Sequence, residues 1–259
     1  MANVVNFWLA AGGLLVVILA LLEVGRRIGI HRRKVDPESA SAGLGTVDGA
    51  VFGLMGLLIA FTFSGAAARF DVRRQLVGEE ANAIGTAYLR LELLPQSAQP
   101  VLRQDFRDYL DARLAILPKL QISIEAAKQE LARSIAFQDK IWNEAVAACR
   151  ETNSPATTTL VLSSLNQMID ITTTRLVAQQ MHPHVVVFYG FGLLVMASSL
   201  LAGYGMAGSK LRSWMHMLVF AVVMAGSTYV ILDLEYPRIG LIRVDKADQV
   251  LVDLRNSMK

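Results

Sequence analysis

A long uncharged stretch, GAVFGLMGLLIAFTFSGAAA, occupies residues 49–68. A helix of this length rises about 30 Å, which matches the thickness of the hydrocarbon layer of a bilayer. Three further apolar runs of similar length lie at Val4–Val24, Val185–Ala207 and Trp214–Leu232. We therefore expect four membrane-spanning helices, arranged as one pair near each end of the chain.

The composition also favours a membrane protein. Hydrophobic residues make up 53% of the chain and charged residues only 18%, whereas soluble domains contain about 45–50% and about 25%. The formal net charge is only +3, and no dense basic face accompanies it, which argues against nucleic-acid binding. The single cysteine, Cys149, excludes an intrachain disulfide bond.

The residues between the two apolar pairs are charged and helical in pattern. Apolar positions recur every three or four residues through this region. The second span is expected to continue as one helix to Leu94, because no proline or glycine pair interrupts residues 66–76 and Pro95 then ends it. Ser97 is a candidate cap for the next helix, and Ser154-Pro155 has the form that opens another.

These patterns predict an all-α, four-span integral membrane protein with a helical extramembrane domain between spans 2 and 3. The expected parts are a transmembrane hairpin, the helical domain, a second hairpin and a C-terminal tail, at residues 1–68, 69–181, 182–235 and 236–259.

Basic residues in the two short loops predict the orientation. They are Arg26, Arg27, Arg32, Arg33 and Lys34 in the first loop, and Lys210 and Arg212 in the second. The positive-inside rule assigns both loops to the cytoplasm and therefore the helical domain to the opposite side. Three arginines just beyond the second span, Arg69, Arg73 and Arg74, oppose this assignment.

A stripe of small residues follows one face of the second span. Its members recur at steps of three or four: Gly49, Gly53, Gly56, Ala60, Ser64 and Ala67. Such a stripe permits close packing of another helix, for which Gly49, Gly53, Ala60 and Ser64 are the candidates. The alternative is a pore lining, with an apolar constriction formed by Phe52, Gly56, Ile59 and Phe63. The bulky residues among them are also typical of contact with lipid or with neighbouring spans.

Charged residues follow the second span on the same expected helix. The candidates for a pore mouth are Arg69, Asp71, Arg73, Glu79, Glu80 and Asn82. The alternative is an ion-paired helix face outside the membrane.

No catalytic motif is visible, so we expect neither an enzyme nor a bound cofactor or metal. The histidines His182 and His184 flank Pro183 without a third ligand nearby, which favours an interfacial role. No Asp, Glu, Lys or Arg lies at the centre of any span. Because ion-coupled transporters usually bury an ionisable residue there, this absence argues against active transport and is compatible with a channel.

Three stretches carry a family resemblance. They are GLMGLLIAFTFS at residues 53–64, RFDVRR followed by EEANAIGTAYLR at 69–74 and 79–90, and DLEYPRIGLIR at 233–243. Together they resemble the bestrophin-like domain family of bacterial membrane proteins, over essentially the whole chain. The resemblance implies kinship with bestrophins, which are pentameric anion channels with a hydrophobic neck on the second span and a cytosolic helical domain. Phe52, Ile59, Phe61 and Phe63 are similar to that neck in type and location.

The leading hypothesis is therefore a passive ion channel in the bacterial inner membrane. Four spans with few polar residues cannot enclose an aqueous path, so we expect a homo-oligomer with the pore on its symmetry axis. The partners are the lipid bilayer, inorganic ions and further copies of the chain, a pentamer by analogy. The alternative is a non-conducting scaffold or stress sensor that acts through its helical domain.

Overall fold

The computed structural model describes residues 2–35, 44–208, 214–237, 240–242 and 245–258. The elements in these ranges are helical, and the ranges contain no strand, which confirms the all-α class. Two basic loop residues used for the orientation, Lys210 and Arg212, lie outside the described residues.

The chain forms two compact units, which we describe separately. The first unit contains Met1–Phe70 and Met181–Arg243, and the second contains Asp71–Gln180 and Val244–Lys259. Each unit therefore combines segments that are far apart in the sequence.

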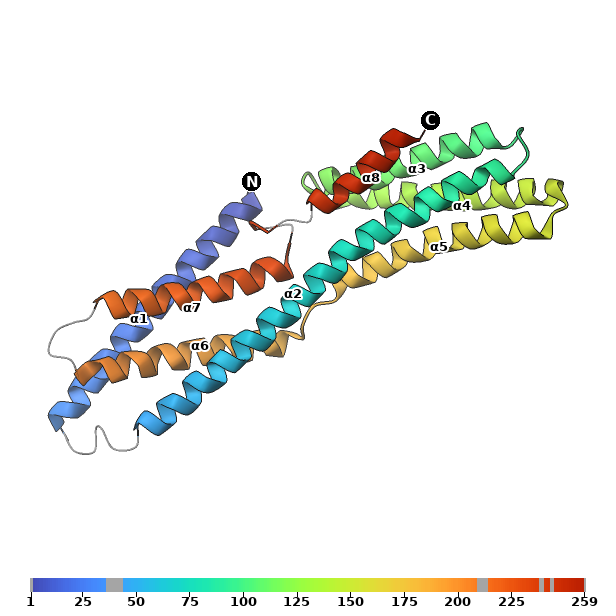
Figure 1. The fold of residues 1–259 in the computed structure, drawn as a ribbon. Coiled ribbons are helices and arrows are strands. Elements are labelled where there is room, and N and C mark those ends of the chain that lie inside the picture. Colours follow the sequence, from blue (N-terminus) through green and yellow to red (C-terminus); the bar gives the residue numbers. More distant parts are fainter. Residues whose placement is uncertain (1, 36–43, 209–213, 238–239, 243–244, 259) are drawn as a thin grey trace. The chain divides into compact units, whose positions relative to one another are not determined.

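The first unit contains the apolar helices. They are α1 (Ala2–Val35), the beginning of α2 (Leu44–Arg90), α6 (Val185–Gly205), the short 3-10 helix η2 (Met206–Gly208) and α7 (Trp214–Glu235). Helix α1 packs against α6 and α7 (Figure 1). All four long helices contribute to one apolar core, which includes Leu22 of α1, Met55 of α2, Phe191 of α6 and Met217 of α7.

Glycines bring the backbones of α1 and α6 together. A β-carbon added to Gly203 would lie 2.0 Å from the carbonyl oxygen of Leu22, and one added to Gly25 would lie 2.1 Å from that of Leu200. Helices approach this closely only where side chains are absent, as is common between helices in membranes. The tightest helix contact in the first unit therefore depends on these two glycines.

Within the described residues, three helical segments are long and apolar enough to cross a membrane: Gly45–Leu93, Pro155–Gly208 and Trp214–Glu235. They contain the second, third and fourth expected spans. The first expected span lies within α1, a helix of 34 residues that is not among these three segments. The count of four spans therefore stays a prediction.

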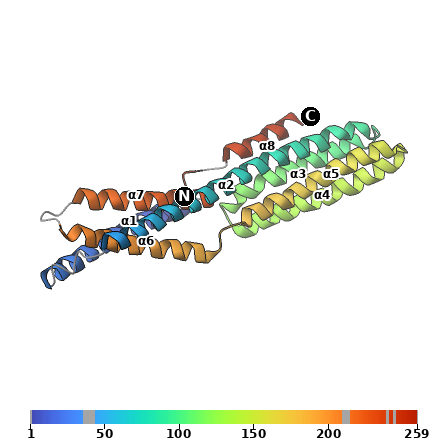
Figure 2. The same cartoon turned by 60° about the horizontal axis from the view of Figure 1, so that its bottom comes forward.

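The second unit is a bundle of amphipathic helices. It contains the remainder of α2, the 3-10 turn η1 (Leu91–Leu93), α3 (Gln99–Leu120), α4 (Ile124–Thr152), α5 (Pro155–Gln180) and α8 (Asp245–Ser257). Helix α4 packs against both α3 and α5, and α8 packs against α3 (Figure 2). The largest buried side chains of the bundle include Tyr109 and Phe106 of α3 and Ile141 of α4.

Several expected boundaries agree with the structure and one does not. Helix α2 runs without interruption for 47 residues, which confirms that the second span continues beyond its apolar stretch. The Ser154 side chain accepts a hydrogen bond from the Thr157 backbone N–H at 3.3 Å, which confirms the predicted opening of α5. The prediction of Ser97 as a cap is wrong: α3 begins one residue later, with Ala98 at the cap position and no side-chain bond.

Candidate functional site

The small-residue stripe of α2 is exposed within the first unit. Gly49, Gly53, Gly56, Ala60 and Ser64 all lie on the open side of the helix. No atom lies within 4 Å of a β-carbon added to any of the three glycines. The stripe from Gly49 to Ser64 therefore makes no close helix contact inside its own unit and is open to another molecule or to a pore, whereas its last member, Ala67, packs against the apolar core.

The four constriction candidates fall into two groups. Phe63 is 45% exposed, and Gly56 is on the open side of the helix. Phe52 is half-buried, and its ring makes an edge-on contact with Phe220 of α7 at a centroid distance of 6.4 Å. Ile59 packs against the apolar core. Only the first group faces away from the helices of its own unit.

The exposed charged candidates lie along α2 in the second unit. Asp71, Glu79 and Asn82 are exposed. Glu79 accepts a hydrogen bond from Gln75 at 2.7 Å. Glu79 and Asn82 also line an open polar groove of about 440 Å³, which Asp170 of α5 borders from the other side. This groove is acidic, so its field attracts cations.

Two other mouth candidates are buried in the second unit. The Arg73 guanidinium donates a hydrogen bond to the carbonyl oxygen of Ala178 at 3.2 Å. Glu80 is fully buried and forms ion pairs with Arg113, at 2.6 Å, and with Arg175. Since both carboxylate oxygens of Glu80 are occupied, this side chain cannot contact a passing ion without breaking those pairs.

The Glu80 cluster extends to the C-terminal helix. Arg175 of α5 also donates to Asp248 of α8 at 2.9 Å, so one chain of ion pairs joins α3, α2, α5 and α8. Nearby, burial raises the pKa of Tyr109 to about 12, and Gln138 donates a hydrogen bond to its hydroxyl at 3.2 Å. Removal of one member of such a buried ionic network is costly, because it leaves a buried charge without a partner.

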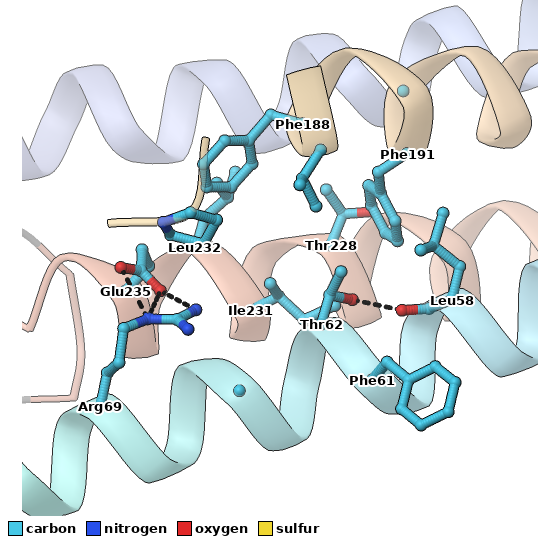
Figure 3. A pocket seen from close by; sticks show the side chains of 14 residues that line it. Leu58, Phe61, Thr62, Arg69, Phe188, Phe191, Thr228, Ile231, Leu232 and Glu235 are labelled. Carbon is cyan, nitrogen blue, oxygen red and sulfur yellow. Dashed lines mark hydrogen bonds and ion pairs between the residues drawn. The ribbon is translucent and has the colours of Figure 1, made fainter. Parts of the chain in front are cut away.

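The last mouth candidate, Arg69, belongs to an ion cluster in the first unit. Its guanidinium binds the Glu235 carboxylate of α7 through Nε and Nη2, with contacts of 2.7 to 3.2 Å (Figure 3). His182 lies on the other side of Glu235, with Nδ1 at 2.8 Å from Oε1. The His182 ring also stacks on Tyr236 at a centroid distance of 4.9 Å. The cluster therefore joins the end of the apolar part of α2, the residues before α6 and the end of α7.

Sequence comparison decides the family. A family model for the Bestrophin-like domain matches residues 11–249. The chain belongs to the Bestrophin-like domain family. A comparison with curated protein sequences finds no significant match.

Solved structures share this Bestrophin-like fold. A crystal structure of a membrane protein with one substitution is 14% identical, with a TM-score of 0.69 over 95% of this chain and 100% of the other. Two substituted forms of a bacterial bestrophin homologue from Klebsiella pneumoniae are 14% and 15% identical. Their TM-scores are 0.68 and 0.66, over 94% of this chain and 97% and 99% of theirs. These similarities show the fold.

The C-terminal string DLEYPRIGLIR, residues 233–243, has a structural role in this chain. The buried carboxylate of Asp233 accepts hydrogen bonds from the backbone N–H groups of Leu241 and Ile242, both at 3.1 Å. A β-carbon added to Gly240 would lie 1.7 Å from the same carboxylate. The acid and the glycine of the string therefore close one turn after α7, while the second acid, Glu235, binds Arg69. Arg238, Ile239 and Arg243 of the string lie outside the described residues.

Sequence patterns missed the partners of the charged residues in this Bestrophin-like protein. Arg69 and Glu235 each end an apolar run with opposite charge, which is a signal for pairing, but nothing in one sequence joins two runs 166 residues apart. Among the described residues, no group of three or more His, Cys, Asp or Glu side chains is placed to hold a metal ion.

Proposed function

We propose that this chain is the subunit of a passive ion channel in the bacterial inner membrane. The observation that carries the proposal is the open face of α2, where the small residues from Gly49 to Ser64 are exposed and the three glycines among them meet no other helix of the unit. In a member of the Bestrophin-like domain family, such a face on a candidate span suits a pore that forms between copies of the chain.

The pore lies on a symmetry axis of a homo-oligomer, with five subunits by analogy with bestrophins. The described helices of the first unit meet in an apolar core, which offers no aqueous path through one subunit. A path for ions therefore needs a surface that several copies share, and closed rotational symmetry provides one. Helix α2 supplies that surface because Gly49, Gly53 and Gly56 on its open face meet no other helix of the first unit.

The constriction consists of Phe63 together with the space left by Gly56. Both lie on the open face of α2, and an apolar ring can gate a pore by dewetting. Phe52 and Ile59 support this ring from the flank, where they pack against their own subunit.

The mouth consists of the exposed polar residues Asp71, Glu79 and Asn82, which follow on the same helix. Glu80 and Arg73 hold the helices of the second unit together behind them. The resemblance to bestrophins favours anions, whereas the exposed carboxylates of this segment favour cations. A reversal potential decides between these two selectivities.

The test is conduction by purified protein in planar bilayers under a KCl gradient. We expect single-channel steps from the wild type and an altered unit conductance from Phe63→Ala. The matched control is Leu54→Ala, which also removes an exposed apolar side chain of α2. Leu54 lies about half a turn around the helix from Phe63, since a separation of nine residues corresponds to about two and a half turns. The unit conductance of Leu54→Ala should therefore equal that of the wild type.

Silence of the wild type alone can reflect a closed gate. Phe63→Ala and Phe52→Ala open an apolar constriction if one exists, so silence of both variants as well contradicts the channel. The protein then acts as a non-conducting scaffold. Equal changes in the Leu54→Ala and Phe63→Ala proteins contradict the assignment of the constriction to Phe63.

A further inference from the structure

An apolar cavity lies beside the Arg69–Glu235 ion pair in the first unit. It has a volume of about 380 Å³ and is lined by residues of α2, α6 and α7 and by Pro183 before α6, with one side open (Figure 3). Large apolar side chains form its walls, among them Phe61, Phe188, Phe191, Ile231 and Leu232. Its volume lies within the range of about 300–1,000 Å³ that is typical of pockets for small molecules.

The middle of the cavity offers no free polar group. Two threonines line it, but each uses its hydroxyl within its own helix. Thr62 donates to the carbonyl oxygen of Leu58 at 2.7 Å, and Thr228 donates to that of Met224 at 2.8 Å. The threonines therefore add apolar surface, and a polar solute or an ion would lose its hydration there without compensation.

One end of the cavity is polar. Arg69 uses Nε and Nη2 for Glu235. Within the described part of the chain, its third nitrogen, Nη1, has no hydrogen-bond acceptor. Nη1 lies 3.2 Å from the place that a β-carbon on Gly65 would occupy, so the glycine leaves this N–H group open to the cavity. The Arg69 side chain is 30% exposed, while the Glu235 side chain is buried and its carboxylate contacts both Arg69 and His182.

The polar end coincides with one end of all three surrounding helices. Arg69 follows the apolar stretch of α2, Pro183 precedes α6, and Glu235 ends α7. The apolar walls consist of residues within the candidate spans. In a bilayer the guanidinium is therefore at the depth of the headgroups and the walls are at the depth of the acyl chains.

From this geometry we propose that the cavity binds a glycerophospholipid. One acyl chain lies between Phe61, Phe188 and Phe191, and the phosphate accepts a hydrogen bond from Nη1 of Arg69. An arginine N–H group without another acceptor can donate to a phosphate oxygen. The cavity as a whole matches an amphiphile, because an amphiphile has a polar group at one end and an apolar chain at the other. The site is independent of whether the protein conducts ions.

Photolabelling tests the proposal. The purified protein in detergent is exposed to phosphatidylethanolamine with a diazirine in its acyl chain, irradiated, digested and mapped by mass spectrometry. We expect labels on residues 58–65 of α2, 187–192 of α6 and 228–232 of α7. A second probe, diacylglycerol with the same labelled chain, lacks the phosphate and should label these segments much less.

Two glycines of α6 provide a matched pair of variants. Gly192 lines the cavity and Gly190 does not, and a β-carbon at either position meets no atom within 4 Å. Gly192→Leu places a side chain inside the cavity. Loss of about two methylene contacts weakens binding about tenfold, so we expect a comparable fall in labelling for Gly192→Leu and no fall for Gly190→Leu.

Three results overturn the proposal. The first is equal labelling of the two glycine variants. The second is equal labelling by diacylglycerol and phospholipid, which excludes the contact between the phosphate and Arg69. The third combines two observations: the cavity walls of the wild type are not labelled, and Gly192→Leu changes the subunit number in native mass spectrometry. Together they would mean that a second copy of the chain fills the cavity.

Discussion

Arg69 and Glu235 form a two-pronged ion pair across 166 positions of sequence, with N–O distances of 2.7 to 3.2 Å. The Glu235 side chain is 1% exposed and the Arg69 side chain is 30% exposed. The pair therefore fixes the end of α7 to α2 in the first unit, and most of the positive charge of Arg69 is neutralised. This arginine contributes little net field to a pore mouth, although one of its N–H groups remains available.

Removal of the Glu235 charge should destabilise the protein. Glu235→Gln leaves Arg69 without its buried partner, which costs about 3 kcal/mol and lowers the melting temperature in detergent by about 6–12 °C. The control is Glu92→Gln, whose carboxylate is 67% exposed and bonded to Arg103 at 3.3 Å, and which should cost less than about 1 kcal/mol. Equal melting temperatures for the two variants would show that the Arg69 pair contributes no more than a surface contact.

Substitution of the adjacent glutamates of α2 should affect two different properties, with Glu80 acting on stability and Glu79 on ion selectivity. Glu80→Gln leaves Arg113 without its carboxylate in the interior of the second unit and leaves Arg175 with Asp248 alone, and it should cost about 3–5 kcal/mol. Glu79→Gln keeps an oxygen for the Gln75 contact and should change stability by less than about 0.5 kcal/mol. In planar bilayers Glu79→Gln should instead shift the reversal potential toward anions. A stable Glu80→Gln protein with altered selectivity would transfer the mouth role to Glu80.

The contact between α1 and α6 should not tolerate one added methyl group. Gly203→Ala places a β-carbon 2.0 Å from the Leu22 carbonyl oxygen, which forces the helices apart and should cost at least about 3 kcal/mol. Gly205→Ala is the control, because its β-carbon meets no atom within 4 Å, and it should be neutral or slightly stabilising, by up to about 1 kcal/mol. Thermal unfolding of both variants in the same detergent tests this, and equal midpoints would contradict the close approach.

Alkaline pH should destabilise the second unit through Tyr109. Burial raises the pKa of this phenol from 10.0 to about 12 in the folded protein. Between pH 10 and pH 12 the unfolded chain releases the proton and the folded chain keeps it. The contribution of this phenol to the free energy of unfolding is therefore fully present below pH 10 and is lost as the pH rises to 12. The loss amounts to about 2.7 kcal/mol for a shift of about two units.

The Tyr109→Phe variant isolates this effect. Above pH 10 the free energy of unfolding of this variant should fall less than that of the wild type, because the phenol is absent. A difference absorbance titration of the folded wild type should show one tyrosine that ionises later than the exposed ones. An identical decline for variant and wild type would mean that Tyr109 ionises normally.

The helices were predictable from the sequence because their signals are local. The absence of proline and paired glycine over residues 66–76 predicted the long α2, and Ser154-Pro155 predicted the start of α5. Helical position also separates Glu79 from Glu80, since adjacent residues lie about 100° apart around a helix. One of them is consequently exposed and the other buried, although the sequence offers no sign of which face the bundle covers.

The tertiary partners were not predictable because they depend on distant segments. Gly49, Gly53 and Gly56 form a regular stripe on α2 and meet nothing within the first unit. The shorter i, i+4 pair on α1, Gly25 and Gly29, packs against α6 instead, although nothing in its own spacing names that partner. Likewise, Glu80 lies 33 positions from Arg113 and 95 from Arg175. A residue pattern within one helix reports the shape of its face, but the identity of the neighbour comes only from the folded chain.

The glycine contact between α1 and α6 also bears on the order of events during synthesis. Gly25 leaves the ribosome about 180 residues before Gly203, and at about 5–20 residues per second this interval lasts about 9–36 s. During that time α1 has no backbone groove to occupy, and its exposed glycine face is open to other nascent or finished chains. Assembly is thus most vulnerable early in translation, and a helper that shields an unpaired helix would act on α1 before α6 emerges.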